Sequence, residues 1–86
     1  MREANAVLQN DDGLHARSAA QFVRVANQFV SDITLVAKGE EVNGKSIIGI
    51  MSLGIYSGQE ITLRAEGEDE DEAIERLSHC VENELI

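Results

Sequence analysis

Apolar residues of this chain recur at two spacings that alternate along its length, and this alternation limits the folds that it can adopt. From 60 to 66 every second residue is apolar, with Ile61, Leu63 and Ala65 on one side, which predicts a strand with one buried face. From 73 to 85 apolar residues recur every three or four positions, which predicts an amphipathic helix. No linker separates the segments, so the predicted strands and helices must pack directly on one another.

The other segments extend the same alternation. Residues 2–9 have a weak period of two, which predicts a strand. From Ala16 to Phe29 apolar residues recur at helical spacing, which predicts a helix of about three turns. A hairpin is predicted for 33–43, with its turn at Gly39. The resulting order, strand-helix-strand-strand-helix-strand-helix, predicts an α+β fold with the helices on one face of an antiparallel sheet.

The last predicted helix carries its own start signal. Asp69 is followed three residues later by Glu72, a spacing that predicts a capping box with Asp69 as the cap. Cys80 lies at the edge of the apolar stripe and is expected to be a small core residue. His79 lies off the stripe, so we assign it to solvent with no role. A single cysteine excludes an internal disulfide and is typical of a reducing compartment.

Length and charge exclude several classes of protein. A chain of 86 residues is expected to form one domain, 1–86. The net charge of −9 is uneven: residues 1–59 hold six acids and five bases, for −1, whereas 60–86 hold ten acids and two bases, for −8. We therefore expect no nucleic-acid partner. The chain has no apolar run long enough for membrane insertion, no secretory signal, and no cluster or loop that predicts a metal, a cofactor or a bound nucleotide.

The run Gly13-Leu14-His15-Ala16-Arg17 stands at the start of the first predicted helix. A helix start carries unpaired N–H groups and partial positive charge, so it favours an anion and disfavours an imidazolium. A neutral His15 is a nucleophile, and its phosphorylated form is an anion that the N–H groups and Arg17 can hold. We therefore predict that His15 accepts a phosphoryl group, that Arg17 stabilises it, and that Ala16 and Ser18 are its neighbours. The alternative is a solvated histidine that only caps the helix.

A second apolar cluster follows Ser46 within two predicted turns. Ile50 and Leu53 share one helix face, which is expected to meet the core. Three further residues cannot all join that face: Ile47, Ile48 and Met51. An exposed cluster that includes a flexible methionine predicts a docking patch for a partner. The alternative is a hydrophobic staple that holds a loose helix to the sheet.

These two segments resemble the motifs of the histidine-containing phosphocarrier (HPr) family of the phosphoenolpyruvate-dependent sugar phosphotransferase system. The run from Gly13 to Arg17 is similar to the phosphorylation motif, and the run from Asn43 to Gly54 is similar to the motif around a regulatory serine. With its matching length and spacing, the resemblance covers essentially the whole chain. It implies an open-faced sandwich of four strands and three helices, and a phosphoryl carrier that is not itself an enzyme.

The resemblance also implies partners. Enzyme I would phosphorylate His15, and sugar permease IIA components would receive the phosphoryl group, in the cytoplasm. Ser46 stands where a helix cap belongs, with Lys45 as a weakly positive neighbour. Gly49 stands three residues after Ser46, as in regulated members of the family. The resemblance therefore also implies that an HPr kinase/phosphorylase phosphorylates Ser46, and that the phosphorylated protein binds a catabolite-control transcription factor. Phosphorylation would add about two negative charges beside the docking patch.

Two alternatives remain within the same family. One is a nitrogen-related paralogue with the same chemistry and another phosphoryl donor. The other is a catabolite-regulatory paralogue that acts mainly as a signalling module through Ser46. The presence of His15 argues against a purely regulatory protein, since such a protein has no need of the nucleophile.

One residue departs from the family pattern, which has proline where this chain has Ser18. As the third residue of the helix, Ser18 would add an N–H and a hydroxyl within reach of His15 and of its phosphoryl group. The alternative is that serine and proline both fit this position. In that case Ser18→Pro would stabilise the protein by about 0.4–1 kcal/mol through the unfolded chain.

Overall fold

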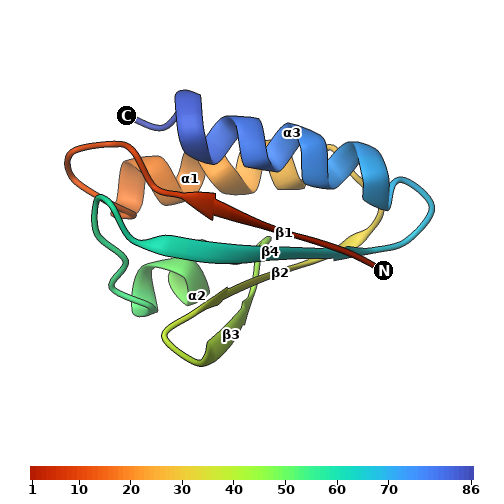
Figure 1. Ribbon diagram of the computed structural model, residues 1–86, viewed down its shortest axis with the longest axis horizontal. Helices are drawn as coiled ribbons and strands as arrows, with labels where there is room; N and C mark the ends of the chain where they lie inside the picture. The colour runs from red at the N-terminus through yellow and green to blue at the C-terminus, as the bar shows by residue number, and fades with distance from the viewer.

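The computed structural model describes residues 1–86 as four strands and three helices (Figure 1). In chain order the elements are β1 (Arg2–Val7), α1 (Ala16–Ala26), β2 (Asp32–Ala37), β3 (Glu40–Asn43), α2 (Ile47–Ser52), β4 (Glu60–Glu66) and α3 (Glu70–Asn83). This order is the predicted one, and the open-faced α+β sandwich is confirmed. None of the three helices is long and apolar enough to cross a membrane.

The sheet has the strand order β1-β4-β2-β3, and every neighbouring pair is antiparallel. In the central strand β4, Leu63 lies opposite Ala4 of β1 on one side and Leu35 of β2 on the other. The long helices α1 and α3 lie side by side along the sheet (Figure 1). The short helix α2 contacts α1 and β3. The outer face of the sheet is polar, and there Arg64 forms ion pairs with Glu3 and Glu41.

The core lies between the sheet and the two long helices. Ile61, Leu63 and Ala65 of β4 are buried, as the alternation predicts, against apolar residues that include Phe22 of α1. Cys80 of α3 belongs to the same core, with 1% of its surface exposed. Burial raises the pKa of its thiol to about 11, so the thiol stays protonated and unreactive.

The start of α3 differs from the prediction. Asp69 is the N-cap residue, but its carboxylate makes no cap hydrogen bond, so the predicted capping box with Glu72 is wrong. The carboxylate instead accepts hydrogen bonds from the N–H of Val30 at 2.9 Å and of Ser31 at 3.0 Å, and from the Ser31 hydroxyl. Three donors converge on Asp69 from the segment after α1, and together they outcompete the local cap.

The first strand is also shorter than predicted, since it ends at Val7 and not at residue 9. Its pairing nevertheless continues by one residue: the N–H of Leu8 donates to the Gln59 carbonyl at 3.0 Å, and its carbonyl accepts from Gly58 at 2.8 Å. The segment before α1 is thereby joined to the loop after α2.

Candidate functional site

His15 is the N-cap residue of α1, with an extended backbone and a half-buried side chain. Its Nδ1 accepts a hydrogen bond from the Arg17 N–H, at 3.2 Å. This bond requires an unprotonated Nδ1, so a neutral ring carries its proton on Nε2. The lone pair of Nδ1 is thus directed at the N–H groups of the helix start, where an anion is favoured.

Gly13 shapes the turn that leads into His15. Its φ is +70°, a left-handed conformation that favours glycine. A Cβ at this position would lie 2.5 Å from the carbonyl oxygen of Ile55 and 2.8 Å from the Cα of Tyr56. The next residue, Leu14, donates its N–H to the same Ile55 carbonyl at 3.0 Å. The turn before His15 therefore packs against the loop that follows α2, and only glycine allows that approach.

Arg17 and Ala16 are exposed in the first turn of α1, next to His15. The Arg17 guanidinium takes part in none of the ion pairs of the chain, which involve Arg2, Arg64, Arg76, His79 and the amino terminus. Arg24 is exposed seven residues further along, on the same helix face. Basic side chains thus line the exposed face of α1, and Arg17 is the one adjacent to the imidazole.

Ser18 is completely buried, with 0% of its surface exposed. Its hydroxyl donates to the Gly13 carbonyl at 2.8 Å and accepts from the His15 N–H at 3.0 Å. The hydroxyl is therefore directed into the turn that precedes α1. Of the two Ser18 donors that the sequence suggests, only the main-chain N–H is directed at the His15 side chain.

The short helix α2 divides its apolar residues between the core and the surface. Ile50 and Leu53 are buried, as the sequence predicts, with 0% and 4% of their surfaces exposed. Ile47, Ile48 and Met51 are exposed, to 39%, 82% and 42% respectively. We refer to these three side chains as the α2 patch. The patch is carried by a helix that packs beside α1, the helix that His15 caps.

Ser46 caps α2 through a hydrogen bond that its Oγ accepts from the Gly49 N–H, at 3.1 Å. A Cβ at Gly49 would lie 3.2 Å from this Oγ, so glycine leaves the hydroxyl uncrowded. The neighbouring Lys45 binds elsewhere: its Nζ donates to the Phe29 carbonyl at 2.8 Å. Ser46 is half-buried, which leaves part of its side chain open to solvent next to the α2 patch.

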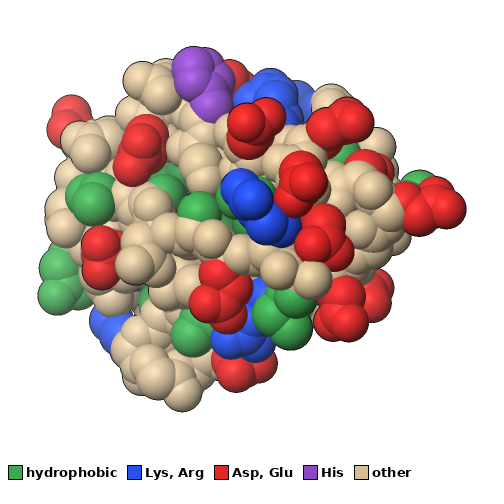
Figure 2. All heavy atoms as spheres, turned by 45° about the vertical axis from the view of Figure 1, so that its right-hand side comes forward, with side chains coloured by type: hydrophobic (Ala, Val, Ile, Leu, Met, Phe, Trp, Pro, Cys, Tyr) green, Lys and Arg blue, Asp and Glu red, His purple; other side chains and the backbone are tan.

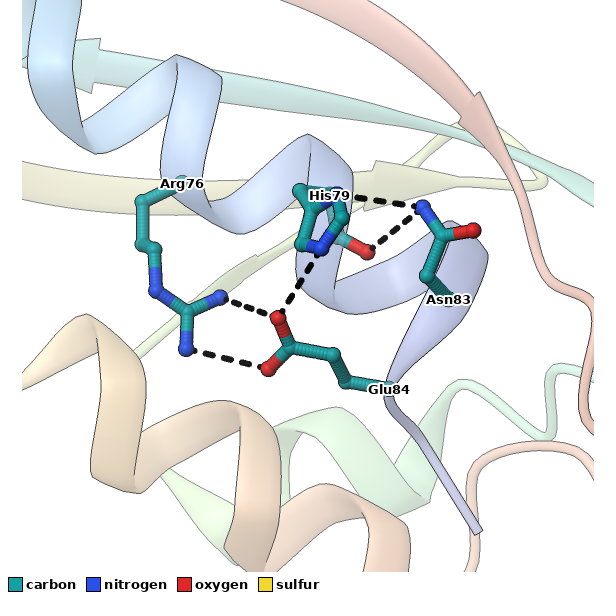
Figure 3. Close-up of polar contacts among 4 residues, drawn as sticks. All are labelled: Arg76, His79, Asn83 and Glu84. Carbon is teal, nitrogen blue, oxygen red and sulfur yellow. Dashed lines mark hydrogen bonds and ion pairs between the residues drawn. The ribbon is translucent and has the colours of Figure 1, made fainter.

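The second histidine has a different environment, at the end of α3 (Figure 3). Glu84 accepts two hydrogen bonds from Arg76, at 2.9 and 3.0 Å, and lies 3.3 Å from Nε2 of His79. Asn83 Nδ2 lies 3.2 Å from Nδ1 of the same ring. His79 is exposed as predicted, but both ring nitrogens have side-chain neighbours, so it is part of a polar cluster at the end of α3 and not a residue without contacts.

Charge is distributed so that the two ends of the molecule differ. The start of α1 lies at one end, with the end of α3, whereas the acidic start of α3 lies at the other (Figure 1). Figure 2 shows acidic side chains gathered on the face that includes the latter end.

Neither of the two surface hollows, of about 410 and 190 Å³, is lined by His15, Arg17 or the α2 patch. The candidate site is therefore an open surface, which suits a protein partner better than a small ligand.

Asn10 is a residue near the site that the sequence reading left unassigned. Its side chain is 8% exposed, and its Nδ2 donates to the Gly13 carbonyl at 2.7 Å. The available signal was an asparagine three residues before a glycine in a turn, because asparagine side chains often bind nearby main-chain groups.

Known proteins match this chain over most of its length. A family model described as "PTS HPr component phosphorylation site" matches residues 2–83. The HPr-like protein Crh of Bacillus subtilis (strain 168) is 53% identical over 73 residues, which cover 85% of this chain and 86% of that protein. The phosphocarrier protein HPr of Buchnera aphidicola is 54% identical over 66 residues, or 77% of this chain and 78% of that protein.

Solved structures agree with these matches. The crystal structure of a phosphocarrier protein HPr from Bacillus anthracis has a TM-score of 0.90 and 44% identity, and covers 94% of this chain and 96% of that chain. The crystal structure of Crh from Bacillus subtilis, described as a domain-swapped dimer, has a TM-score of 0.79 and 46% identity, and covers 100% of this chain and 99% of that chain. HPr and Crh proteins thus resemble this chain to a similar degree.

Proposed function

This chain belongs to the HPr family of phosphocarrier proteins of the phosphotransferase system, and from this premise we propose that His15 is the residue that carries the phosphoryl group. As a family member the protein is a phosphocarrier and not an enzyme. In our proposal enzyme I donates the phosphoryl group, and a sugar permease IIA component accepts it. The observation that carries the proposal is the imidazole of His15 at the start of α1, with Nδ1 against the Arg17 N–H.

The geometry supports Nδ1 as the attacking atom. Its lone pair is directed toward the helix start, so a phosphoryl group bonded to Nδ1 would replace the present hydrogen bond and offer its oxygens to the same N–H groups. The exposed Arg17 would supply a positive charge for the transferred group. The open surface supports transfer in both directions, because a donor protein and an acceptor protein can each reach His15.

Labelling with phosphoenolpyruvate and purified enzyme I tests this proposal. We expect the wild-type protein to acquire an acid-labile, base-stable phosphoryl group that a IIA component then removes. His15→Ala should abolish labelling, whereas His79→Ala, which alters the other histidine of the chain, should leave it intact. Labelling that survives in His15→Ala would contradict the proposal.

A second function is supported by Ser46 and by the Crh relatives. Crh of Bacillus subtilis is described as a catabolite repression HPr. In this chain Ser46 is half-buried at the start of α2, and the exposed α2 patch begins at the next residue. We propose that an HPr kinase/phosphorylase phosphorylates Ser46 and that the modified patch binds a catabolite-control transcription factor.

The two functions are separable because they use different residues. Incubation with ATP and an HPr kinase/phosphorylase should give an acid-stable phosphoserine in the wild-type protein and in His15→Ala. Ser46→Ala should lose this label, whereas Ser52→Ala, which alters another serine of α2, should keep it. If the wild-type protein is not labelled, the proposed regulatory function is contradicted and only the carrier function remains.

A further inference from the structure

The carbonyl oxygen of Gly13 accepts hydrogen bonds from two side chains that approach from opposite directions along the chain. Asn10 Nδ2 donates at 2.7 Å from the preceding turn, and Ser18 Oγ donates at 2.8 Å from the first turn of α1. A carbonyl oxygen has two lone pairs, so both of its acceptor positions are filled. Both side chains are more than nine-tenths buried, which shields these bonds from water.

Ser18 links this carbonyl directly to His15. Its hydroxyl proton points at the Gly13 oxygen, and a lone pair of the same Oγ accepts the His15 N–H at 3.0 Å. One hydroxyl therefore bridges the peptide groups on the two sides of Leu14. The left-handed φ of Gly13 and the extended backbone of His15 are fixed relative to one another by this bridge.

Asn10 anchors the arrangement to the rest of the fold. Its Nδ2 also donates to the main-chain oxygen of Ile86 at 3.0 Å, and the Ile86 N–H donates to Gln21 Oε1 of α1 at 3.0 Å. Its Oδ1 is buried and accepts no hydrogen bond from the protein. The side chain thus acts as a double donor, which joins the turn before His15 to the residues that follow α3.

We infer that Ser18 and Asn10 are positioning residues for His15. They hold the Gly13 carbonyl in place and thereby fix the backbone that brings His15 Nδ1 within hydrogen-bond distance of the Arg17 N–H. This inference rests on the proposed function of His15. The family pattern places proline at position 18, and proline has neither a hydroxyl nor an N–H with which to bind the turn. In this chain a pair of buried hydrogen bonds takes the place of a rigid ring.

The test is single-turnover phosphoryl transfer from phosphorylated enzyme I, measured at rising concentrations of this protein. Such a series yields a maximal rate and a half-saturating concentration. For Ser18→Ala and for Asn10→Ala we expect the maximal rate to fall about three- to tenfold, because each variant loses a side-chain hydrogen bond to the Gly13 carbonyl. The half-saturating concentration should stay unchanged, because the α2 patch is not altered.

A matched control separates positioning from general loosening of the fold. Ser31 is also a buried serine, 1% exposed, whose hydroxyl is bound to Asp69 beyond the opposite end of α1. Ser31→Ala also removes a buried side-chain hydrogen bond, and it should leave the maximal rate unchanged. Circular dichroism checks that all variants are folded. The double variant of Ser18 and Asn10 should lose more than the product of the single losses, because it leaves the Gly13 carbonyl without a side-chain donor.

The outcomes are distinct. Maximal rates equal to that of the wild type, or reduced no further than in Ser31→Ala, would overturn the positioning role, as would a change confined to the half-saturating concentration. If Ser18→Ala does not fold, Asn10→Ala alone decides the question. A wild-type protein that accepts no phosphoryl group would overturn the proposed function and this inference together, whereas normal transfer in every variant would overturn only this inference.

Discussion

The carboxylate of Asp69 holds the main-chain N–H and the hydroxyl of Ser31, a residue that precedes it by 38 positions. The same carboxylate binds the N–H of Val30. These bonds fasten the segment after α1 to the start of α3. These bonds favour the ionised carboxylate and lower the pKa of Asp69 below its ordinary value of 3.8. The hydrogen bond from the Ser31 hydroxyl has the largest effect, followed by the one from the Val30 N–H.

We predict that Asp69→Ala lowers the urea midpoint at neutral pH, whereas Glu72→Ala, which alters the expected partner of the capping box, leaves it nearly unchanged. Because the pKa of Asp69 is lowered in the folded state, its contribution is complete above the unfolded pKa near 3.8 and is lost as pH falls through the folded pKa. The midpoints of wild type and Asp69→Ala should therefore converge in acid. A constant difference down to the lowest pH at which the protein folds would contradict this assignment.

Arg17 should matter for transfer and not for stability. Its side chain is exposed and forms no ion pair, so Arg17→Ala should leave the thermal midpoint unchanged. Loss of a charged hydrogen bond to the phosphoryl group should slow transfer from enzyme I by about 10- to 100-fold. Arg24→Ala removes an equal charge from the same helix face and serves as the control. Equal slowing in the two variants would indicate general electrostatic attraction and not contact with the transferred group.

The α2 patch should contribute to binding without contributing to the core. Ile48 is 82% exposed, so Ile48→Asp should weaken the binding of enzyme I with a stability change within about 0.5 kcal/mol. Val30 is 73% exposed but lies outside α2, and Val30→Asp should leave binding unchanged. Titration calorimetry and urea unfolding together check both statements. Unfolding of Ile48→Asp would show that this side chain belongs to the core.

Phosphorylation of Ser46 should act through charge. Aspartate and asparagine are both good N-cap residues, so Ser46→Asp and Ser46→Asn should each keep α2 folded. Only the aspartate adds a negative charge beside the α2 patch. We expect Ser46→Asp to slow the phosphorylation of His15 by enzyme I, while Ser46→Asn resembles wild type. Equal rates in the two variants would argue against electrostatic regulation at this position.

The elements that the sequence predicts best are those whose signal is local. The period of two from 60 to 66 matches the bounds of β4, and the split between Ile50 and Leu53 inside and Ile48 outside is the one that the structure has. In each case the side-chain period by itself decides which face meets the core. The position of His15 at the start of α1 was predictable for the same reason, since the helix pattern begins at the next residue.

The interactions that the sequence did not reveal depend on where distant or strained segments meet. The partners of Asp69 are 38 and 39 residues away, so the local sequence indicates only the nearby Glu72 as a partner. The roles of Asn10 and Ser18 depend on the direction of one carbonyl, which the positive φ of Gly13 turns toward both side chains. A turn residue can be recognised from sequence, but the direction of its carbonyl cannot.

Ser18→Pro now has a different expected outcome from the one that the sequence alone suggests. Proline would stabilise the folded protein by about 0.4–1 kcal/mol, because it restricts the unfolded chain. The structure adds an opposing effect: the substitution removes the hydrogen bonds of the Ser18 hydroxyl to the Gly13 carbonyl and the His15 N–H, each of which contributes about 0.5–1.5 kcal/mol. We therefore expect a net loss of about 1 kcal/mol in the free energy of unfolding.

Ser18→Ala is the control for this substitution, because it removes the same hydroxyl without restricting the unfolded chain. It should be less stable than Ser18→Pro by the proline effect, about 0.4–1 kcal/mol. Urea unfolding of the three proteins should therefore rank them as wild type, Ser18→Pro and Ser18→Ala, in decreasing order of stability. A Ser18→Pro protein more stable than wild type would show that the hydroxyl contributes less than the proline effect, and that serine is merely tolerated at this position.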